Sequence, residues 1–227
     1  MEIRWLGHSA FALESDGVTV LVDPFLTGNP KAAVSADEVA ADAILLTHGH
    51  ADHVGDTVSI ASRTGAPVVA ITELAAELRG DLPDGHQVVD PNIGGTATFD
   101  WGSARLVPAW HTSTTPKGTV NTPAGLVIEI GGVRIYHLGD TALFSDLSLP
   151  GARDRIDVAL VCVGGHFTMD PRDAVMAAEL IRADRIVPCH YGTFPQIDVD
   201  VEAFKREVEA EGHAEVRVLD PGESLPC

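Results

Sequence analysis

The feature that most constrains this chain is a short apolar run, residues 43–46, that leads directly into a stretch crowded with histidine and aspartate. Such a run is typical of a strand buried on both faces of a sheet. Four ligand-type side chains follow within six residues: His48, His50, Asp52 and His53. Zinc, manganese and iron all accept imidazole and carboxylate ligands. The sequence therefore predicts a metal site at the end of this strand.

The spacing of these four side chains indicates two metal ions rather than one. Side chains two residues apart in an extended chain point the same way, so His48 and His50 can share one metal as the strand ends. Asp52 and His53 follow the turn and point toward a second metal beside the first. The alternative is a polar loop that holds histidines by coincidence, and four ligand-type residues within six positions count against it.

Further ligands are expected where later apolar strands end. His111, Asp140 and His190 each stand just past an apolar segment, as His48 does. An aspartate between two metals can bridge them and hold them roughly 3.5–4 Å apart, and Asp140 is the expected bridge. Taken alone, each of these three residues can also be an ordinary turn or loop residue.

Composition and charge restrict the partners and the compartment. The chain has 227 residues, of which 45% are hydrophobic, and this suits one globular domain over residues 1–227. A net charge of −18 without a basic cluster argues against nucleic-acid binding. Three cysteines without a CxxC motif favour a reducing compartment. Neither a signal peptide nor a membrane-length apolar stretch is visible, so we expect a cytoplasmic protein without membrane insertion. The expected partner is a small-molecule substrate, and a homo-oligomer is possible.

The order of predicted elements indicates the fold class. Strands come first in each half and alternating helices and strands follow, which suggests two sheets packed face to face with helices outside. A hairpin is expected around Asp16-Gly17, and the apolar run 156–163 predicts a doubly buried strand. The other expected elements include helices beginning at 35–38 and at 171, helices over 54–62, 73–79 and 201–209, a last strand over 216–219, and a flexible surface loop over 112–122.

The whole ligand pattern resembles the metallo-β-lactamase superfamily. That resemblance rests on His48-Gly49-His50-Ala51-Asp52-His53 followed by His111, Asp140 and His190. It implies an α+β fold, a four-layer αββα sandwich of two mixed sheets with helices outside. By position it assigns one metal to His48, His50 and His111, and the other to Asp52, His53 and His190, with Asp140 as the bridge.

Within the superfamily the chain is similar to a branch of small bacterial and archaeal metal-dependent hydrolases. That branch is itself similar to L-ascorbate-6-phosphate lactonases and to phospholipase-D-type phosphodiesterases. The motifs that carry the likeness are Trp5-Leu6-Gly7-His8-Ser9-Ala10-Phe11, Asp23-Pro24-Phe25-Leu26-Thr27-Gly28-Asn29-Pro30, Leu138-Gly139-Asp140-Thr141, Phe167-Thr168-Met169 and Pro188-Cys189-His190-Tyr191-Gly192-Thr193-Phe194-Pro195.

Departures from other branches narrow the expected function. Asp140 stands where class B β-lactamases carry a cysteine, and His53 adds a ligand that their second site lacks. His50 stands where flavodiiron proteins carry a glutamate, which favours hydrolysis over oxygen reduction. The tRNase Z branch shares the ligand set but needs a basic RNA-gripping arm, which this acidic chain lacks.

The expected activity is hydrolysis of a small ester, lactone or phosphodiester by a hydroxide that bridges two divalent metal ions, zinc first, with manganese or iron also acceptable. Asp52 is the expected acceptor of the water proton, and His166 either donates a proton to the leaving group or shapes the pocket. His8 is expected either to support a metal ligand or to make a purely structural hydrogen bond. Thr168 and Tyr191 are expected to line the pocket. The alternatives are a metal-binding sensor or scaffold without turnover, and a redox di-iron protein.

Overall fold

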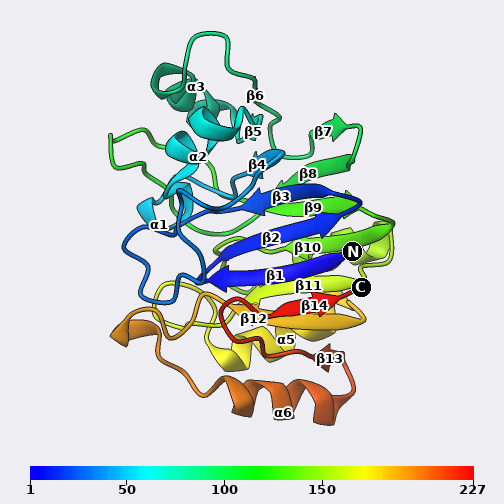
Figure 1. Ribbon diagram of the computed structural model, residues 1–227. Coiled ribbons are helices and arrows are strands. Elements are labelled where there is room, and N and C mark those ends of the chain that lie inside the picture. The colour runs from blue at the N-terminus through cyan, green and yellow to red at the C-terminus, as the bar shows by residue number, and fades with distance from the viewer.

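The computed structural model describes residues 1–227 as two seven-stranded sheets packed face to face, with helices on the outer sides (Figure 1). The strand orders are β14-β1-β2-β3-β4-β5-β6 and β13-β12-β11-β10-β9-β8-β7. Both sheets are mixed, so the predicted αββα sandwich of α+β class is confirmed. None of the helices has the length and apolar character needed to span a membrane.

The first sheet begins as an antiparallel meander and continues with parallel strands. Its meander is β1 (Glu2–Gly7), β2 (Ala10–Ser15) and β3 (Val18–Val22), and β14 (Ser224–Pro226) adds antiparallel to β1. The parallel strands are β4 (Ala43–Leu45), β5 (Val68–Val69) and β6 (Val88–Val89). Its helices are α1 (Ala51–Val54), α2 (Thr57–Thr64) and α3 (Thr72–Asp81).

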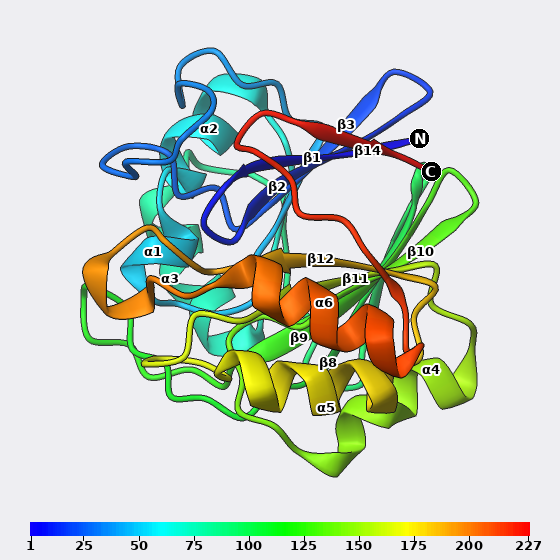
Figure 2. The same ribbon diagram turned by 90° about the horizontal axis from the view of Figure 1, so that it is seen from below.

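The second sheet repeats this plan. Its antiparallel strands are β7 (Thr96–Phe99), β8 (Gly102–Pro108), β9 (Ala124–Ile130) and β10 (Val133–His137). The parallel strands are β11 (Val158–Cys162), β12 (Arg185–Cys189) and β13 (Glu215–Val216). Its helical elements are the 3₁₀ turns η1 (Ser145–Ser148) and η2 (Pro195–Ile197), and the helices α4 (Leu149–Arg153), α5 (Pro171–Ile181) and α6 (Val201–Glu211). Figure 2 shows α5 and α6 side by side along this sheet.

Burial explains why these sequences form these elements. Every residue of β4 and of β11 is buried, as the two apolar runs predict. The main core is a cluster of 63 buried residues that draws on both sheets. Asp170 caps α5 by accepting from the Asp173 N–H, and Pro171 takes the first helical position, where it sacrifices no hydrogen bond.

Several expected elements are wrong or shifted. No helix begins at 35–38, where residues 36–38 form only a turn. The helix expected over 54–62 is two helices, because Gly55 has φ +39° and a Cβ there would lie 2.5 Å from the Phe25 Cα. The last strand stops at Val216, and β14 was not expected.

The loop over 112–122 is only partly the flexible surface loop that its composition predicts. Lys117 and Gly118 are exposed at its tip. Ser113, Thr115 and Asn121 are buried, because the loop folds back over the start of the His-rich stretch. The Gly49 N–H lies 2.9 Å from the Ser113 Oγ and 3.1 Å from the Asn121 Oδ1.

Candidate metal centre

Four donor side chains are positioned by the end of β4 and the short helix after it. His48 is fully buried three residues past β4, and His50 is half-buried before α1. The carbonyl of His50 accepts from the His53 N–H at 3.0 Å, which begins the helix that carries Asp52 and His53. Gly49, between His48 and His50, leaves no room for a side chain, because a Cβ there would lie 2.4 Å from the Asn121 Nδ2.

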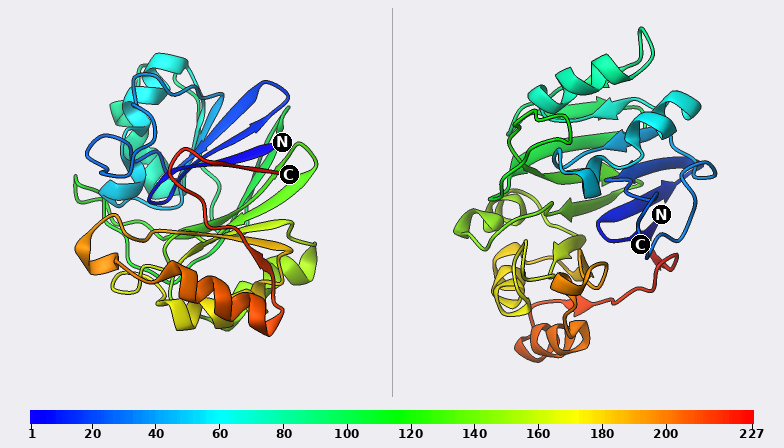
Figure 3. Two further views of the ribbon diagram at one scale, coloured as in Figure 1. Left: turned by 60° about the horizontal axis from the view of Figure 1, so that its bottom comes forward. Right: turned by 90° about the vertical axis from the view of Figure 1, so that its left-hand side faces the viewer.

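The second sheet supplies three more donors from the same edge of the sandwich. His111 follows β8, Asp140 follows β10, and His190 directly follows β12. Figure 3 (right) looks onto this edge, where α1 and the segment after β12 both lie. The carboxyl ends of the parallel strands meet there, which is where such folds gather their ligands.

The donor atoms form two groups that meet at one carboxylate, since donor atoms of His48, His53 and Asp140 also lie within 4.8 Å of one another. Donor atoms of His48, His50 and His111 lie within 4.8 Å of one another, and so do those of Asp52, His53 and His190 together with His8. We call the first set the open triad (His48, His50, His111) and the second the buried triad (Asp52, His53, His190). Asp140 touches both, because its Oδ2 lies 3.1 Å from the His190 Nε2 and 3.6 Å from the His111 Nε2.

The unsatisfied atoms of the site fit a metal ion. The buried atoms His53 Nε2, Asp140 Oδ1 and both ring nitrogens of His190 have no hydrogen-bond partner. Buried polar atoms in folded proteins are almost always bonded, so the orphaned His53 Nε2 and His190 Nε2, which both lie beside the Asp140 carboxylate, indicate a missing partner. Each orphan is an imidazole nitrogen or a carboxylate oxygen, and both are ligands for zinc, manganese and iron.

The electrostatics of His48 and Asp140 also favour cation binding. Burial, helped by the neighbouring His53, holds the pKa of His48 well below its ordinary value, so this ring is neutral. Burial alone would raise the pKa of Asp140, but His190 and His53 outweigh it and hold that pKa well below its ordinary value. A neutral imidazole and an ionised carboxylate are the forms that bind a metal.

Asp23, which follows β3, orients the buried triad, although the sequence analysis placed it only in a family motif and gave it no role at the site. The His53 Nδ1–H donates to the Asp23 Oδ2 at 2.8 Å, which leaves the His53 Nε2 free to face Asp140. The Thr47 N–H donates to the Asp23 Oδ1 at 2.8 Å, and the Thr47 hydroxyl donates to Oδ2 at 2.6 Å. An aspartate directly after a buried strand, in register with β4, was the available signal.

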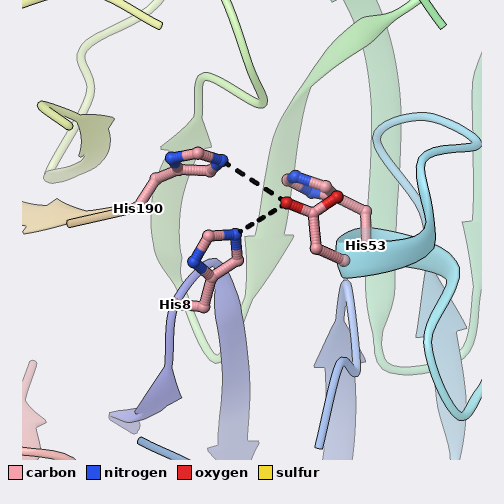
Figure 4. A group of neighbouring side chains, drawn as sticks. His8, His53 and His190 are labelled. Atoms are coloured by element: carbon pink, nitrogen blue, oxygen red, sulfur yellow. Dashed lines mark hydrogen bonds and ion pairs between the residues drawn. The ribbon is translucent and has the colours of Figure 1, made fainter. Parts of the chain in front are cut away.

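His8 lies behind the buried triad, in contact with two of its members (Figure 4). Its Nε2 is 3.1 Å from the Asp52 Oδ2, and its Nδ1 is 2.9 Å from the Thr193 hydroxyl. Its carbonyl accepts from the His190 N–H at 3.0 Å and from the Trp5 Nε1–H at 2.9 Å. Burial lowers the pKa of His8 to about 4, so the ring is neutral at physiological pH.

A cleft of about 470 Å³ opens onto the donors. Five of the seven expected ligands line it, and its other walls are formed by Thr112, Phe167, Phe194, Pro195 and Gln196. No lysine or arginine lines it. Sequence reasoning assigned no role to Phe194, which stood only within the motif that ends at Pro195, or to Gln196, which directly follows that motif.

The remaining expected site residues lie outside this lining. His166 is exposed and packs edge-on against Phe167 at 4.6 Å between ring centroids. Thr168 is half-buried, and its hydroxyl has no partner. Tyr191 is buried and stacks on Trp5 at 5.4 Å between ring centroids, so it packs behind the site.

A family model described as a beta-lactamase superfamily domain matches residues 2–190. The chain belongs to the metallo-β-lactamase superfamily. UPF0173 metal-dependent hydrolases of Methanopyrus kandleri and Thermus thermophilus are each 49% identical to it over 229 residues. These alignments cover 99% of this chain and 99% and 98% of the two relatives.

A solved structure supports the same branch of the metallo-β-lactamase superfamily. Igni18, a metallo hydrolase from the archaeon Ignicoccus hospitalis, is 38% identical and superposes with a TM-score of 0.89 over 99% of this chain and 97% of its own. The isothiocyanate hydrolase from Delia radicum gut bacteria shares the fold with a TM-score of 0.77 at 18% identity. The predicted relationship to small metal-dependent hydrolases is thereby confirmed.

Proposed function

We propose that this chain is a dinuclear metallohydrolase whose substrate is a small ester, lactone or phosphodiester, with neutral esters and lactones preferred. The observation that carries the proposal is the position of Asp140, one carboxylate in contact with donors of both triads. A single metal would leave one triad without a role. The two triads draw on both sheets, so the whole chain acts as one unit.

The ligands would divide as the two triads do. His48, His50 and His111 would hold one ion and Asp52, His53 and His190 the other, with Asp140 shared. Two divalent ions, zinc first and manganese or iron as alternatives, would lower the pKa of water toward neutrality and polarise the scissile group.

The protein's own side chains would orient the substrate and handle protons. Asp52 lines the cleft, and the contact with His8 helps to keep its pKa below the ordinary value despite burial, so the carboxylate is ionised. It would hold a metal ion and would be available to accept the proton of the reacting water. His166 would have to turn inward to protonate a leaving group, because its side chain is exposed and outside the lining. We therefore assign no step to His166.

The walls of the cleft favour a substrate with an apolar part. Phe167, Phe194 and Pro195 line the cleft together with the donors, and no lysine or arginine is present to clamp a phosphate. The volume of about 470 Å³ falls in the range for small-molecule sites, which is roughly 300–1,000 Å³. A lactone or ester with an aliphatic or aromatic group fits these walls better than a phosphorylated sugar.

Metal analysis combined with a substrate screen tests the proposal. We expect about two metal ions per chain, and faster turnover of aryl esters and lactones than of phosphodiesters. Asp140→Ala should lose both metal and turnover, while Asp198→Ala, an exposed aspartate on the segment after η2, should keep both. A chain that binds two metals and hydrolyses none of these classes would contradict the proposal and favour a metal sensor.

A further inference from the structure

A second cavity, of about 440 Å³, lies on the outer face of the second sheet. Its floor is formed by β8, β9 and β10, and its wall by η1 and α4. It shares no lining residue with the metal cleft. Side chains alternate along a strand, so Ser103, Arg105 and Val107 of β8 face this cavity while Ala104 and Leu106 between them enter the core.

The strand register places four side chains in one row on the floor of the cavity. Thr96, Arg105, Val127 and Tyr136 stand opposite one another across four neighbouring strands, and all four line the cavity. Side chains paired in this way share one face of the sheet and contact one another. The row therefore places one guanidinium among a hydroxyl, a valine and an aromatic ring.

Arg105 is the one cation of this lining without a counter-ion. Arg134 pairs with the Glu129 Oε1 at 2.6 Å, and Arg153 pairs with the Asp154 Oδ2 at 3.4 Å. Arg105 makes no ion pair, and its Nε is buried without a hydrogen-bond partner. The chain has 33 acidic and 15 basic residues, so an unpaired arginine is not explained by a shortage of carboxylates.

An anion would complete this arrangement. A buried donor that lacks a partner carries a desolvation cost, and a charge-assisted hydrogen bond removes it. The third carboxylate of the lining, Asp146, accepts from the Ser145 hydroxyl at 3.0 Å and forms no ion pair with Arg105. The partner of Arg105 would therefore come from outside the chain.

The rest of the lining determines what kind of anion fits. Val107, Val127 and Tyr136 form an apolar floor, and Leu149, which is 57% exposed, stands at the wall. The volume again falls within the range of roughly 300–1,000 Å³ for small-molecule sites. We infer that this cavity binds a small amphipathic carboxylate, with its charged end on Arg105 and its apolar body on the valines and Leu149.

Calorimetric titration of the metal-loaded protein with octanoate tests this inference. Octanamide, which has the same chain without the charge, is the matched ligand, and Arg172→Gln, an exposed unpaired arginine on α5, is the matched variant. We expect saturable octanoate binding that weakens about tenfold or more in Arg105→Gln, because a charge-assisted bond is lost. Octanamide should bind as weakly to the wild type as octanoate does to Arg105→Gln, and Arg172→Gln should match the wild type.

A second cavity variant and two control readouts distinguish loss of the binding site from loss of the fold. Leu149→Asp adds a negative charge at an exposed position of the wall, so it should also weaken octanoate binding without perturbing the core. Hydrolysis and melting temperature of both cavity variants should match the wild type, because the cavity shares no residue with the metal centre.

Three outcomes would overturn the inference. Octanoate that binds Arg105→Gln as well as the wild type would place its binding elsewhere, for example on the metals. Absence of saturable binding at millimolar octanoate would show that the cavity takes no such anion. Self-association in sedimentation that Arg105→Gln abolishes would assign the face to a second copy of the chain.

Discussion

The two triads of the metal centre differ in their ligands, three histidines against one aspartate and two histidines, and in how firmly these ligands are held. In the buried triad, Asp23 fixes His53, and His8 contacts both Asp52 and the main chain of His190. In the open triad, His50 and His111 are partly exposed, and the ring of His50 contacts the rings of His48 and His111. Supporting hydrogen bonds orient metal ligands and raise metal affinity. We therefore expect the buried triad to hold its metal more tightly, and the open triad to gain and lose its metal more readily.

Removing one ligand from either triad should have the largest effect on turnover and on metal content. His50→Ala should lower turnover by about a thousandfold or more. Metal activation lowers the activation free energy by several kcal/mol, and each 1.36 kcal/mol is a factor of ten in rate. It should leave about one tightly bound metal in the buried triad. His53→Ala should lose the tight metal instead. Metal content after dialysis against a weak chelator distinguishes the two, and equal retention in both variants would show that the triads do not differ.

Asp23→Asn should have the next largest effect. It removes the charge that orients His53 while keeping the shape, so affinity for the tightly bound metal should fall about 10–100-fold. Chelator competition on the metal-loaded protein measures this, with Asp37→Asn, an exposed aspartate in a turn, as the matched control. Unchanged affinity would mean that the Asp23–His53 hydrogen bond serves stability alone.

His8→Asn should have a smaller effect, which falls on catalysis. Asparagine tolerates the left-handed backbone that His8 adopts, at φ 57°, but it lacks the Nε2 that contacts Asp52. Loss of one hydrogen bond of about 1 kcal/mol should lower kcat roughly fivefold and leave KM nearly unchanged. A change in KM alone would indicate that His8 acts on substrate binding instead.

Phe167→Ala should have the smallest effect and should spare both triads. The phenyl ring is half-exposed at the wall of the cleft, so its loss should raise KM for an aryl ester by several-fold through reduced apolar contact. KM for a short alkyl ester should change less, and metal content should not change. Steady-state kinetics on the two esters provide the measurement, and equal effects on both would argue against an apolar contact at Phe167.

The sequence predicted the fold and the positions of the seven donors because both depend on local patterns. Apolar strands with a polar residue at the end place His48, His111, Asp140 and His190 at one edge, whatever the details of the loops. Membership of the family was equally readable from motifs.

What sequence reasoning missed depends on contacts between distant segments. Asp23 acts through residues 24 and 30 positions later in the chain, so no local pattern reveals its hydrogen bonds to Thr47 and His53. The break at Gly55 follows from the passage of Phe25 beside it. The strand β14 forms only because β1 offers a free edge, since its own three residues carry no strand pattern.

The hydrogen bond from the His190 N–H to the His8 carbonyl joins the two sheets by main chain, at two residues that both have left-handed backbones, with φ 56° and 57°. Non-glycine residues hold such conformations only where their surroundings enforce them. Separation of the sandwich at this edge would break that hydrogen bond and displace His190 in the same movement. The exchange of one backbone amide with deuterium would therefore report how often the metal edge of the protein opens, before any metal is lost.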